Sequence, residues 1–160
     1  MDTIHNIKVA DIDGNLLDFS AFKGKKLLIV NTASECGYTP QYTQLQELFD
    51  TFKNSIVVIG IPCNDFGAQE PGSDQQIKIF CTENYPVSFP LTTKLKLKGN
   101  EPSPLFQWLT KKELNGVKDI EIQWNFHKIV LDENGFIVND FPSSVSPFDM
   151  ALLQALGIEE

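Results

Sequence analysis

The sequence predicts an α/β fold in which helices flank a central mixed β-sheet. Two apolar runs, residues 26–31 and 55–61, are continuous rather than alternating, which is typical of strands buried on both faces. A helical pattern follows each run, and this alternation favours a parallel core. Two later runs, residues 126–131 and 136–141, are joined by a short turn and add antiparallel strands, so the sheet is expected to be mixed.

A β-hairpin is predicted at the N-terminus. Residues 7–18 alternate around Asp13-Gly14, a dipeptide that favours a tight turn between antiparallel strands. The rest of the chain has no internal repeat, low-complexity stretch or linker. A length of 160 residues without such a break predicts one domain, residues 1–160.

Four helices are predicted from capping residues and apolar spacing. Three of them start at expected N-cap residues: Thr39, Ser73 and Ser146. Thr39 and Ser146 each precede a proline, which is favoured at the first helical position, and Ser73 begins a capping box. The four predicted spans are 39–52, 73–81, 104–114 and 146–156. Hairpin, strands and helices in this order are typical of a thioredoxin-like fold.

The composition is that of a globular protein with an acidic surface. Apolar residues make up 42% of the chain, and thirteen basic against twenty-one acidic residues give a net charge of −8. An acidic chain with no basic run is a poor candidate for binding nucleic acid or for stable membrane association. All the basic residues are lysines, so any carboxylate is recognised without the guanidinium fork of arginine.

Three cysteines, Cys36, Cys63 and Cys81, are too few for a secreted disulfide scaffold. The first ten residues lack the apolar core of a secretory leader, and no apolar run approaches the length of a membrane span. We therefore expect a cytoplasmic protein with reduced cysteines. Such cysteines are inert core residues, metal ligands or redox groups.

A metal site is not expected. No two cysteines are close in the sequence, and neither His5 nor His127 has a second ligand nearby, which disfavours zinc. His127 is interpreted as a surface or hydrogen-bonded histidine rather than as a catalytic base.

Cys36 is the candidate nucleophile. It lies between the carboxyl end of a predicted buried strand and the start of a helix, where reacting groups gather in open α/β sheets. Free N–H groups and the helix dipole there favour a thiolate, and Gly37 leaves its approach unobstructed. Glu35 is an adjacent negative charge that opposes ionisation unless it points away. Position alone leaves a buried, inert cysteine as an alternative.

Three motifs point to a family: NTASECGYTPQY (31–42), IPCNDFGAQEPGSD (61–74) and WNFHKIVLD (124–132). With them the chain resembles the glutathione peroxidase family, in particular its cysteine-containing branch that is reduced by thioredoxin. The resemblance covers about residues 9–147 and implies a thioredoxin-like thiol peroxidase. It departs from the family at Thr32, where valine is common, and at Glu35, where lysine is frequent.

The resemblance assigns roles to individual residues. The peroxidatic cysteine falls on Cys36, and the rest of the family's active site falls on Gln69, Trp124 and Asn125. Each of these three side chains carries an N–H donor. Neutral donors converging on one sulfur would stabilise a thiolate, orient a peroxide and stabilise the departing oxygen. Attack of Cys36 on the peroxide would release water or an alcohol and leave a sulfenic acid.

The family's resolving cysteine lies in a Phe-Cys-x-x-Asn-Tyr segment, which is residues 80–85 here, so that role falls on Cys81. Because a disulfide requires close Cα atoms and Cys81 lies inside a predicted helix, we expect that helix to unwind locally before Cys36 and Cys81 join. Cys63 is interpreted as structural, with a resolving role as the alternative.

The resemblance also implies partners. The absence of arginine and the presence of Cys81 favour a dithiol reductant, thioredoxin, over glutathione. The substrate would be hydrogen peroxide or an organic hydroperoxide, and no cofactor is implied. Residues 114–124 form a short segment where tetrameric members carry an insertion, so we expect a monomer or a weak homodimer.

Other functions use the same residues. A peroxide sensor or redox relay would pass the disulfide to a partner protein and would turn over poorly alone, and a glutathione-dependent peroxidase is a further alternative. A disulfide reductase of thioredoxin type is disfavoured because the chain has no Cys-x-x-Cys pair. A purely structural module has no need of Cys36, Gln69, Trp124 and Asn125 together.

Overall fold

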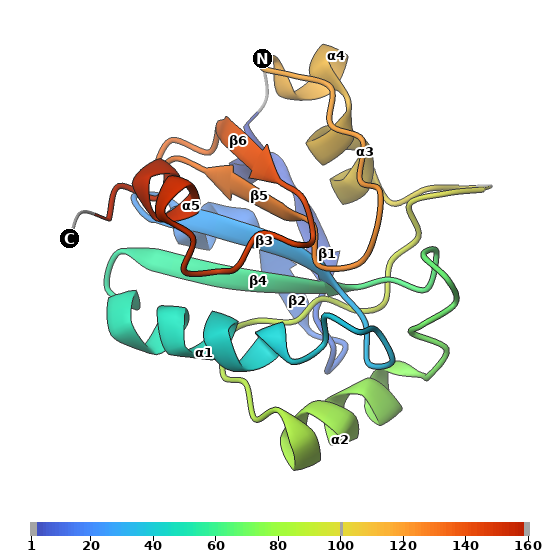
Figure 1. Ribbon diagram of the computed structural model, residues 1–160. Helices are drawn as coiled ribbons and strands as arrows, with labels where there is room; N and C mark the ends of the chain where they lie inside the picture. The colour runs from blue at the N-terminus through green and yellow to red at the C-terminus, as the bar shows by residue number, and fades with distance from the viewer. Residues whose placement is uncertain (1–2, 100, 159–160) are drawn as a thin grey trace.

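The computed structural model describes residues 3–99 and 101–158, and a four-stranded sheet of order β4-β3-β5-β6 lies at its centre (Figure 1). Its strands are β3 (Lys26–Thr32), β4 (Ile56–Pro62), β5 (Lys128–Leu131) and β6 (Ile137–Phe141). β3 and β4 run parallel, whereas β5 is antiparallel to both β3 and β6. The predicted mixed sheet is therefore confirmed. Residues 1 and 160, the predicted ends of the domain, lie outside the described residues.

The apolar runs form strands because both faces of the sheet are covered. Every residue of β4 is buried, as are all of β3 except Lys26. Successive side chains point to opposite faces, so Leu28 and Val58 contribute to a first core while Leu27 and Val57 contribute to a second. A continuous apolar strand is the sequence signature of this two-sided burial.

Helices cover both faces (Figure 1). The first core is covered by α1 (Gln41–Phe52), α2 (Asp74–Asn84) and α5 (Met150–Ala155), which place Leu45, Ile77 and Leu152 in it. The second core is covered by α3 (Pro104–Thr110), through Leu105 and Leu109, and by the 3-10 helices Ile4–Asn6 and Phe19–Phe22. The predicted layering of helices around the sheet is confirmed.

The N-terminal hairpin is confirmed as a separate two-stranded sheet of β1 (Lys8–Ala10) and β2 (Leu16–Asp18). Its turn is longer than the two-residue type that Asp13-Gly14 suggests. Asp11 Oδ1 accepts hydrogen bonds from the N–H groups of Asp13 and Asn15, both at 2.9 Å, and so closes a five-residue loop.

The capping box at the start of α2 is confirmed. Ser73 Oγ accepts from Gln76 N–H, and the Gln76 side chain accepts from Ser73 N–H at 2.8 Å. These reciprocal bonds fix the start of the helix that carries Cys81.

Two predicted helix starts are wrong. Helix α1 begins at Gln41, and Thr39 does not cap it because the Thr39 hydroxyl is engaged with the loop around Cys36. Helix α5 begins at Met150 with Asp149 as its N-cap. Ser146 Oγ instead accepts from Phe148 N–H at 3.1 Å, which stabilises a turn before the helix.

The predicted helix over residues 104–114 is two helices, α3 and α4 (Lys112–Asn115). Lys111 between them is extended, with φ −114° and ψ 116°. The Thr110 carbonyl accepts a hydrogen bond from Ile120 N–H at 3.0 Å, and Lys112 N–H donates to Asp119 Oδ1 at 2.8 Å. These bonds to the following loop replace continuation of the helix.

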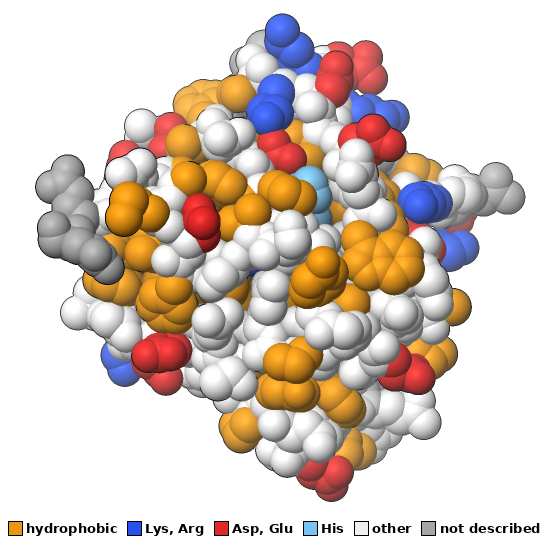
Figure 2. Space-filling model, viewed as in Figure 1, with side chains coloured by type: hydrophobic (Ala, Val, Ile, Leu, Met, Phe, Trp, Pro, Cys, Tyr) orange, Lys and Arg blue, Asp and Glu red, His pale blue; other side chains and the backbone are white. Residues whose placement is uncertain are grey.

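Within the described ranges, no helix combines the length and the apolarity needed to cross a membrane. On the face in Figure 2, lysine side chains lie in separate groups with acidic side chains among them.

Candidate active site

Cys36 lies in the loop that joins β3 to α1. Its side chain is largely buried, and Sγ accepts a hydrogen bond from Tyr38 N–H at 3.3 Å. Cys36 N–H donates to Thr39 Oγ1 at 3.1 Å, and that hydroxyl donates to the Ala33 carbonyl at 2.7 Å. Thr39 therefore shapes the loop in which the Tyr38 N–H points at the sulfur.

The other two cysteines are also buried, one in each core. Burial raises the pKa of Cys63 to about 12 and that of Cys81 to about 11, so both are thiols at neutral pH. Cys81, on α2, belongs to the same core as Cys36, whereas Cys63, after β4, belongs to the core on the opposite face of the sheet.

Gln69 and Asn125 are in direct contact. Asn125 is fully buried, and its Nδ2 donates to Gln69 Oε1 at 3.0 Å and to the Phe66 carbonyl at 3.1 Å. The Gln69 carbonyl accepts from Glu35 N–H at 3.0 Å, which joins this pair to the Cys36 loop. Because Gln69 Oε1 faces Asn125, the Gln69 NH₂ group is turned away from it and has no hydrogen-bond partner in the described part of the chain.

Trp124 lies over the same loop. Its ring packs edge-on against Phe66, with centroids 6.3 Å apart, and about a third of the side chain is exposed. Gly67 permits this contact: it has φ +67°, and a Cβ there would lie 2.6 Å from Cη2 of Trp124. Gly67 is therefore required both for its backbone conformation and for the space that the indole occupies.

The turn that carries Trp124 and Asn125 is anchored by residues that sequence reasoning missed. Asn31, at the end of β3, donates from Nδ2 to the Trp124 carbonyl and accepts at Oδ1 from His127 N–H, both at 3.0 Å. The sequence does contain a signal for this role, because Asn31 is a polar residue at the end of an otherwise apolar run. Phe126 has φ +65°, which is unfavourable for a residue with a side chain, so these bonds hold a strained turn.

Lys128 also holds this turn. It is completely buried, and Nζ donates to the carbonyls of Phe126 at 2.8 Å and of Ser143 at 3.0 Å. His127 is buried and contacts Asp140, with 2.7 Å between Nε2 and Oδ2, so the prediction of a hydrogen-bonded histidine is confirmed.

The four residues predicted for the active site thus come from three loops that meet at one end of the sheet. Cys36 Sγ accepts its hydrogen bond from Tyr38 N–H, and the NH₂ group of Asn125 donates to Phe66 and Gln69. Trp124 Nε1, like the Gln69 NH₂ group, has no hydrogen-bond partner among the described residues. Two N–H donors of the predicted site are therefore free to bind a ligand. No group of three or more His, Cys, Asp and Glu residues is placed to hold a metal within residues 3–99 and 101–158.

The family model described as glutathione peroxidase matches residues 4–110. The chain belongs to the glutathione peroxidase family. It is therefore an enzyme of the peroxidase class, as the sequence motifs predicted.

Relatives of this glutathione peroxidase family member cover almost its whole length. It is 40% identical over 149 residues to "Glutathione peroxidase-like peroxiredoxin gpx1" of Schizosaccharomyces pombe, with 92% of this chain and 93% of the relative covered. It is 42% identical over 158 residues to "Hydroperoxy fatty acid reductase gpx1" of Synechocystis, with 94% and 92% covered. The crystal structure of T. cruzi GPX1 superposes with a TM-score of 0.71 at 31% identity, covering 98% of this chain and 97% of that one. These matches confirm the thioredoxin-like fold.

Replacing Asn125 by aspartate in this peroxidase is expected to lower the free energy of unfolding by about 2–4 kcal/mol and to slow the reaction with peroxide. The carboxylate cannot donate, so the Phe66 carbonyl and Gln69 Oε1 would each face an acceptor in a buried site, where a lost partner costs about 1–3 kcal/mol. Gln69 would also lose the bond that orients its amide. Urea unfolding and stopped-flow reaction with hydrogen peroxide measure the two effects.

The matched control is Asn134→Asp, which makes the same change of charge at an exposed position between β5 and β6. It is expected to leave both quantities within error of the unchanged protein. Equal stabilities of the two variants would contradict the positioning role of Asn125.

Proposed function

We propose that the protein is a thiol peroxidase in which Cys36 is the peroxidatic cysteine and Cys81 the resolving cysteine, with thioredoxin as the reductant. The observation that carries the proposal is the distribution of the cysteines between the two cores. Cys36 and Cys81 share one core, and Cys63 lies across the sheet from them. Because a disulfide requires Cα atoms within about 7 Å, the sheet favours Cys81 over Cys63 as the partner of Cys36.

In the first step the thiolate of Cys36 attacks one peroxide oxygen. An S–O bond forms, the O–O bond breaks, and the leaving oxygen takes a proton to become water or an alcohol, so that Cys36 becomes a sulfenic acid. Tyr38 N–H supports the charge on sulfur before attack. The unpartnered donors of Gln69 and Trp124 orient the peroxide and stabilise the negative charge that develops on the leaving oxygen.

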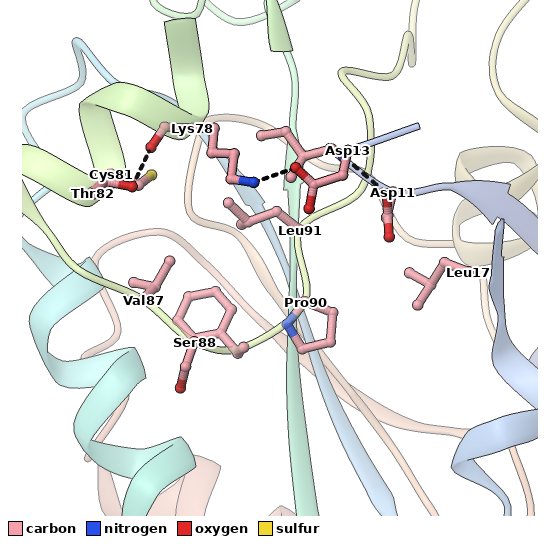
Figure 3. Close-up of a pocket in the computed structure, with 12 residues that line it drawn as sticks. Asp11, Asp13, Leu17, Lys78, Cys81, Thr82, Val87, Ser88, Pro90 and Leu91 are labelled. Atoms are coloured by element: carbon pink, nitrogen blue, oxygen red, sulfur yellow. Dashed lines mark hydrogen bonds and ion pairs between the residues drawn. The ribbon is translucent and has the colours of Figure 1, made fainter. Parts of the chain in front are cut away.

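In the second step the Cys81 sulfur forms an S–S bond with Cys36, the S–O bond of the sulfenic acid breaks, and the hydroxyl group leaves with the thiol proton as water. Cys81 lies in the last turn of α2, is 3% exposed, and its carbonyl accepts from Tyr85 N–H at 2.9 Å. In this proposal the end of α2 unwinds so that the Cys81 sulfur can reach Cys36. A pocket of about 390 Å³ beside Cys81, between α2 and the β1–β2 hairpin, provides space for that movement (Figure 3). An ion pair between Lys78 and Asp13 crosses it and holds α2 to the hairpin.

Thioredoxin then reduces the disulfide by thiol exchange. Three features support it over glutathione: the absence of arginine, the presence of a second cysteine in the same core, and the peroxiredoxin name of the Schizosaccharomyces pombe relative. The name of the Synechocystis relative supports organic hydroperoxides, alongside hydrogen peroxide, as substrates. Three free cysteines suit the cytoplasm, and the short segment before β5 supports a monomer or weak homodimer.

A peptide map tests the proposal directly. The protein is treated with one equivalent of hydrogen peroxide without reductant, free thiols are alkylated, and the digest is analysed by mass spectrometry. A crosslink between Cys36 and Cys81 is expected. An unmodified Cys36 would refute the peroxidase site, and oxidised Cys36 with free Cys81 would move the resolving role to Cys63 or to glutathione.

Replacing Cys81 by serine is expected to lower thioredoxin-driven turnover about a hundredfold, since the sulfenic acid then has no thiol in the same core to resolve it. The variant should still consume about one equivalent of peroxide. Coupled oxidation of NADPH through thioredoxin and its reductase measures turnover. The matched control is Cys63→Ala, which removes the thiol of the other core and should keep turnover within about twofold. Slow turnover of the unchanged protein with excess thioredoxin would favour a sensor or relay instead.

A further inference from the structure

The end of β3 is connected to all three loops that carry the predicted site residues. Residues 31–33 follow one another there, and each of them bonds to a different loop. The three bonds are Asn31 Nδ2 to the Trp124 carbonyl at 3.0 Å, Cys63 N–H to the Thr32 carbonyl at 3.1 Å, and Thr39 Oγ1 to the Ala33 carbonyl at 2.7 Å. The relative placement of the loops therefore depends on these three residues.

Asn31 holds its loop through its side chain, whereas the other two bonds use backbone carbonyls. Besides the bond to Trp124, Asn31 Oδ1 accepts from His127 N–H at 3.0 Å. The carbonyl of Asn31 accepts from Phe126 N–H at 2.6 Å. One residue thus bonds to three of the residues 124–127, and two of these bonds can be removed by a substitution.

The orientation of the Asn31 amide is unambiguous. A carbonyl only accepts and a backbone N–H only donates, so the NH₂ group must face Trp124 and the oxygen must face His127. The side chain is 3% exposed, so solvent has little access to either bond. An asparagine is therefore matched to this position in both its donor and its acceptor.

The turn between these two bonds has a strained backbone. Phe126 has φ +65°, which is unfavourable for a residue with a side chain. Its ring packs edge-on against Tyr42 in the first core, with centroids 5.4 Å apart, so the ring is anchored. Relaxation of the backbone would then move the residues before Phe126. The Asn31 side chain spans Phe126 from Trp124 to His127 and opposes that movement.

The residues before Phe126 are those that bear on the donors of the predicted site. Trp124 supplies one donor through its indole N–H. Asn125 Nδ2 donates to Gln69 Oε1 at 3.0 Å, so a shift of the turn would also move the amide of Gln69. Since Asn31 lies on the strand that leads into the Cys36 loop, its side chain fixes both donors relative to the sulfur.

We propose that Asn31 is a positioning residue for the peroxide reaction. Its amide holds the turn of Trp124 and Asn125 so that the donors of Trp124 and Gln69 face a peroxide at Cys36. The inference rests on the proposed function and adds to it the residue that aligns the donors with the nucleophile. The role is indirect, because Asn31 acts through the turn and not on the reacting atoms.

The test is Asn31→Ala in the full chain, with two reactions of Cys36 followed in the same protein. One is the second-order reaction with hydrogen peroxide, and the other is alkylation by iodoacetamide, located at Cys36 by peptide mapping. The peroxide reaction needs aligned donors to stabilise the leaving oxygen, whereas alkylation needs only the thiolate.

The rate constant for peroxide is expected to fall at least about tenfold, less than the roughly 10²–10³-fold cost of removing one such donor outright. Alkylation of Cys36 should stay within about twofold, because the bonds of Thr39 and Tyr38 still hold the Cys36 loop. A positioning role thus lowers the ratio of the two rate constants, which a general loss of structure would not do.

The matched control for stability is Asn115→Ala. Asn115 is also completely buried, and its amide likewise bonds to backbone on both sides: Nδ2 donates to the Trp108 carbonyl at 3.0 Å and Oδ1 accepts from Val117 N–H at 2.8 Å. It lies in α4, well apart from the loop between β3 and α1 (Figure 1). This variant should lose comparable stability in urea but keep the peroxide rate constant within about twofold.

Three results overturn the proposal. They are an unchanged peroxide rate constant in Asn31→Ala, an equal fall in both reactions of Cys36, and an equal fall of the peroxide reaction in Asn115→Ala. Failure of the proposed function is a different result, in which Cys36 of the unchanged protein does not react with peroxide.

Asn31→Asp keeps the test decisive if Asn31→Ala fails to fold, because it preserves the shape of the side chain. The carboxylate can still accept from His127 N–H, but no donor remains for the Trp124 carbonyl. Its charge acts on the Cys36 thiolate in both reactions, so the ratio of the two rate constants isolates the lost bond. That ratio is also expected to fall about tenfold. An unchanged ratio would exclude the bond to Trp124 as the cause of the alignment.

Discussion

Replacing Cys36 by serine is expected to lower the rate of peroxide consumption by at least about 10³-fold. A serine hydroxyl stays protonated at neutral pH and is not a nucleophile without a strong base beside it. The remaining thiols cannot substitute, because burial raises the pKa of Cys81 to about 11 and of Cys63 to about 12. At pH 7 their thiolate fractions are about 10⁻⁴ and 10⁻⁵, so neither thiol is an appreciable nucleophile.

The measurement is the initial rate of hydrogen peroxide loss with thioredoxin in excess. Cys63→Ala is the control, since it removes a cysteine from the opposite core and should keep the rate. Residual activity above about one part in a hundred in the Cys36→Ser variant would mean that another group attacks peroxide. If both variants lose the peroxide reaction, the two thiols are needed for the stability of the fold rather than for the chemistry.

Much of the fold was predictable because two-sided burial leaves a simple sequence pattern. The continuous apolar runs became β3 and β4, and the capping box at Ser73 began α2 as predicted. Local signals failed where the tertiary structure used the same atoms for another purpose. Thr39 is a residue type that is favoured at N-caps, but its hydroxyl accepts from Cys36 N–H and donates to the Ala33 carbonyl. The requirements of the loop around the nucleophile therefore override helix capping.

The site was predictable only in part. Its motifs predict Cys36, Gln69, Trp124 and Asn125 as site residues, and two of these, Gln69 and Asn125, are in direct contact. The commitment of the Asn125 amide to Gln69 and the Phe66 carbonyl was not predictable, because it depends on where a distant loop carbonyl lies. These two bonds hold the Gln69 side chain and the Phe66 carbonyl to Asn125.

The burial of Lys128 is a second feature that the sequence does not predict. A single lysine is normally a surface residue, yet this one is completely buried on a strand whose other members are apolar. Burial lowers its pKa from 10.5 to about 7. A neutral amine still has two N–H groups, enough for the carbonyls of Phe126 and Ser143.

The stability that depends on Lys128 is therefore expected to change strongly with pH. Between pH 7 and 10.5 the unfolded chain binds more protons at this residue than the folded chain, so the free energy of unfolding rises with pH. Each pH unit between 7 and 10.5 raises the free energy of unfolding by at most about 1.4 kcal/mol. From pH 7.5 to 9.5 the increase is therefore up to about 3 kcal/mol. Below pH 7 the full cost of burying the charge is present, and above 10.5 it is absent.

The test compares Lys128→Met with the unchanged protein by urea unfolding at pH 7.5 and 9.5. Methionine cannot donate to the two carbonyls, and each lost bond costs about 1–3 kcal/mol, but it also carries no charge to bury. The variant should therefore be close to the unchanged protein in stability at pH 7.5 and several kcal/mol less stable at pH 9.5. Groups that titrate elsewhere in the chain contribute equally to both proteins and cancel in the difference.

The control is Lys53→Met, which removes an exposed lysine just after α1. Its free energy of unfolding should change with pH as that of the unchanged protein does. If the free energies of unfolding of Lys128→Met and the unchanged protein differ by the same amount at both pH values, Lys128 stays charged in the fold.

The peroxide reaction adds a second readout, because Lys128 holds the Phe126 carbonyl next to Asn125. If the anchored turn positions Gln69, the reaction of Cys36 should slow in Lys128→Met even at pH 7.5, where its stability is nearly unchanged.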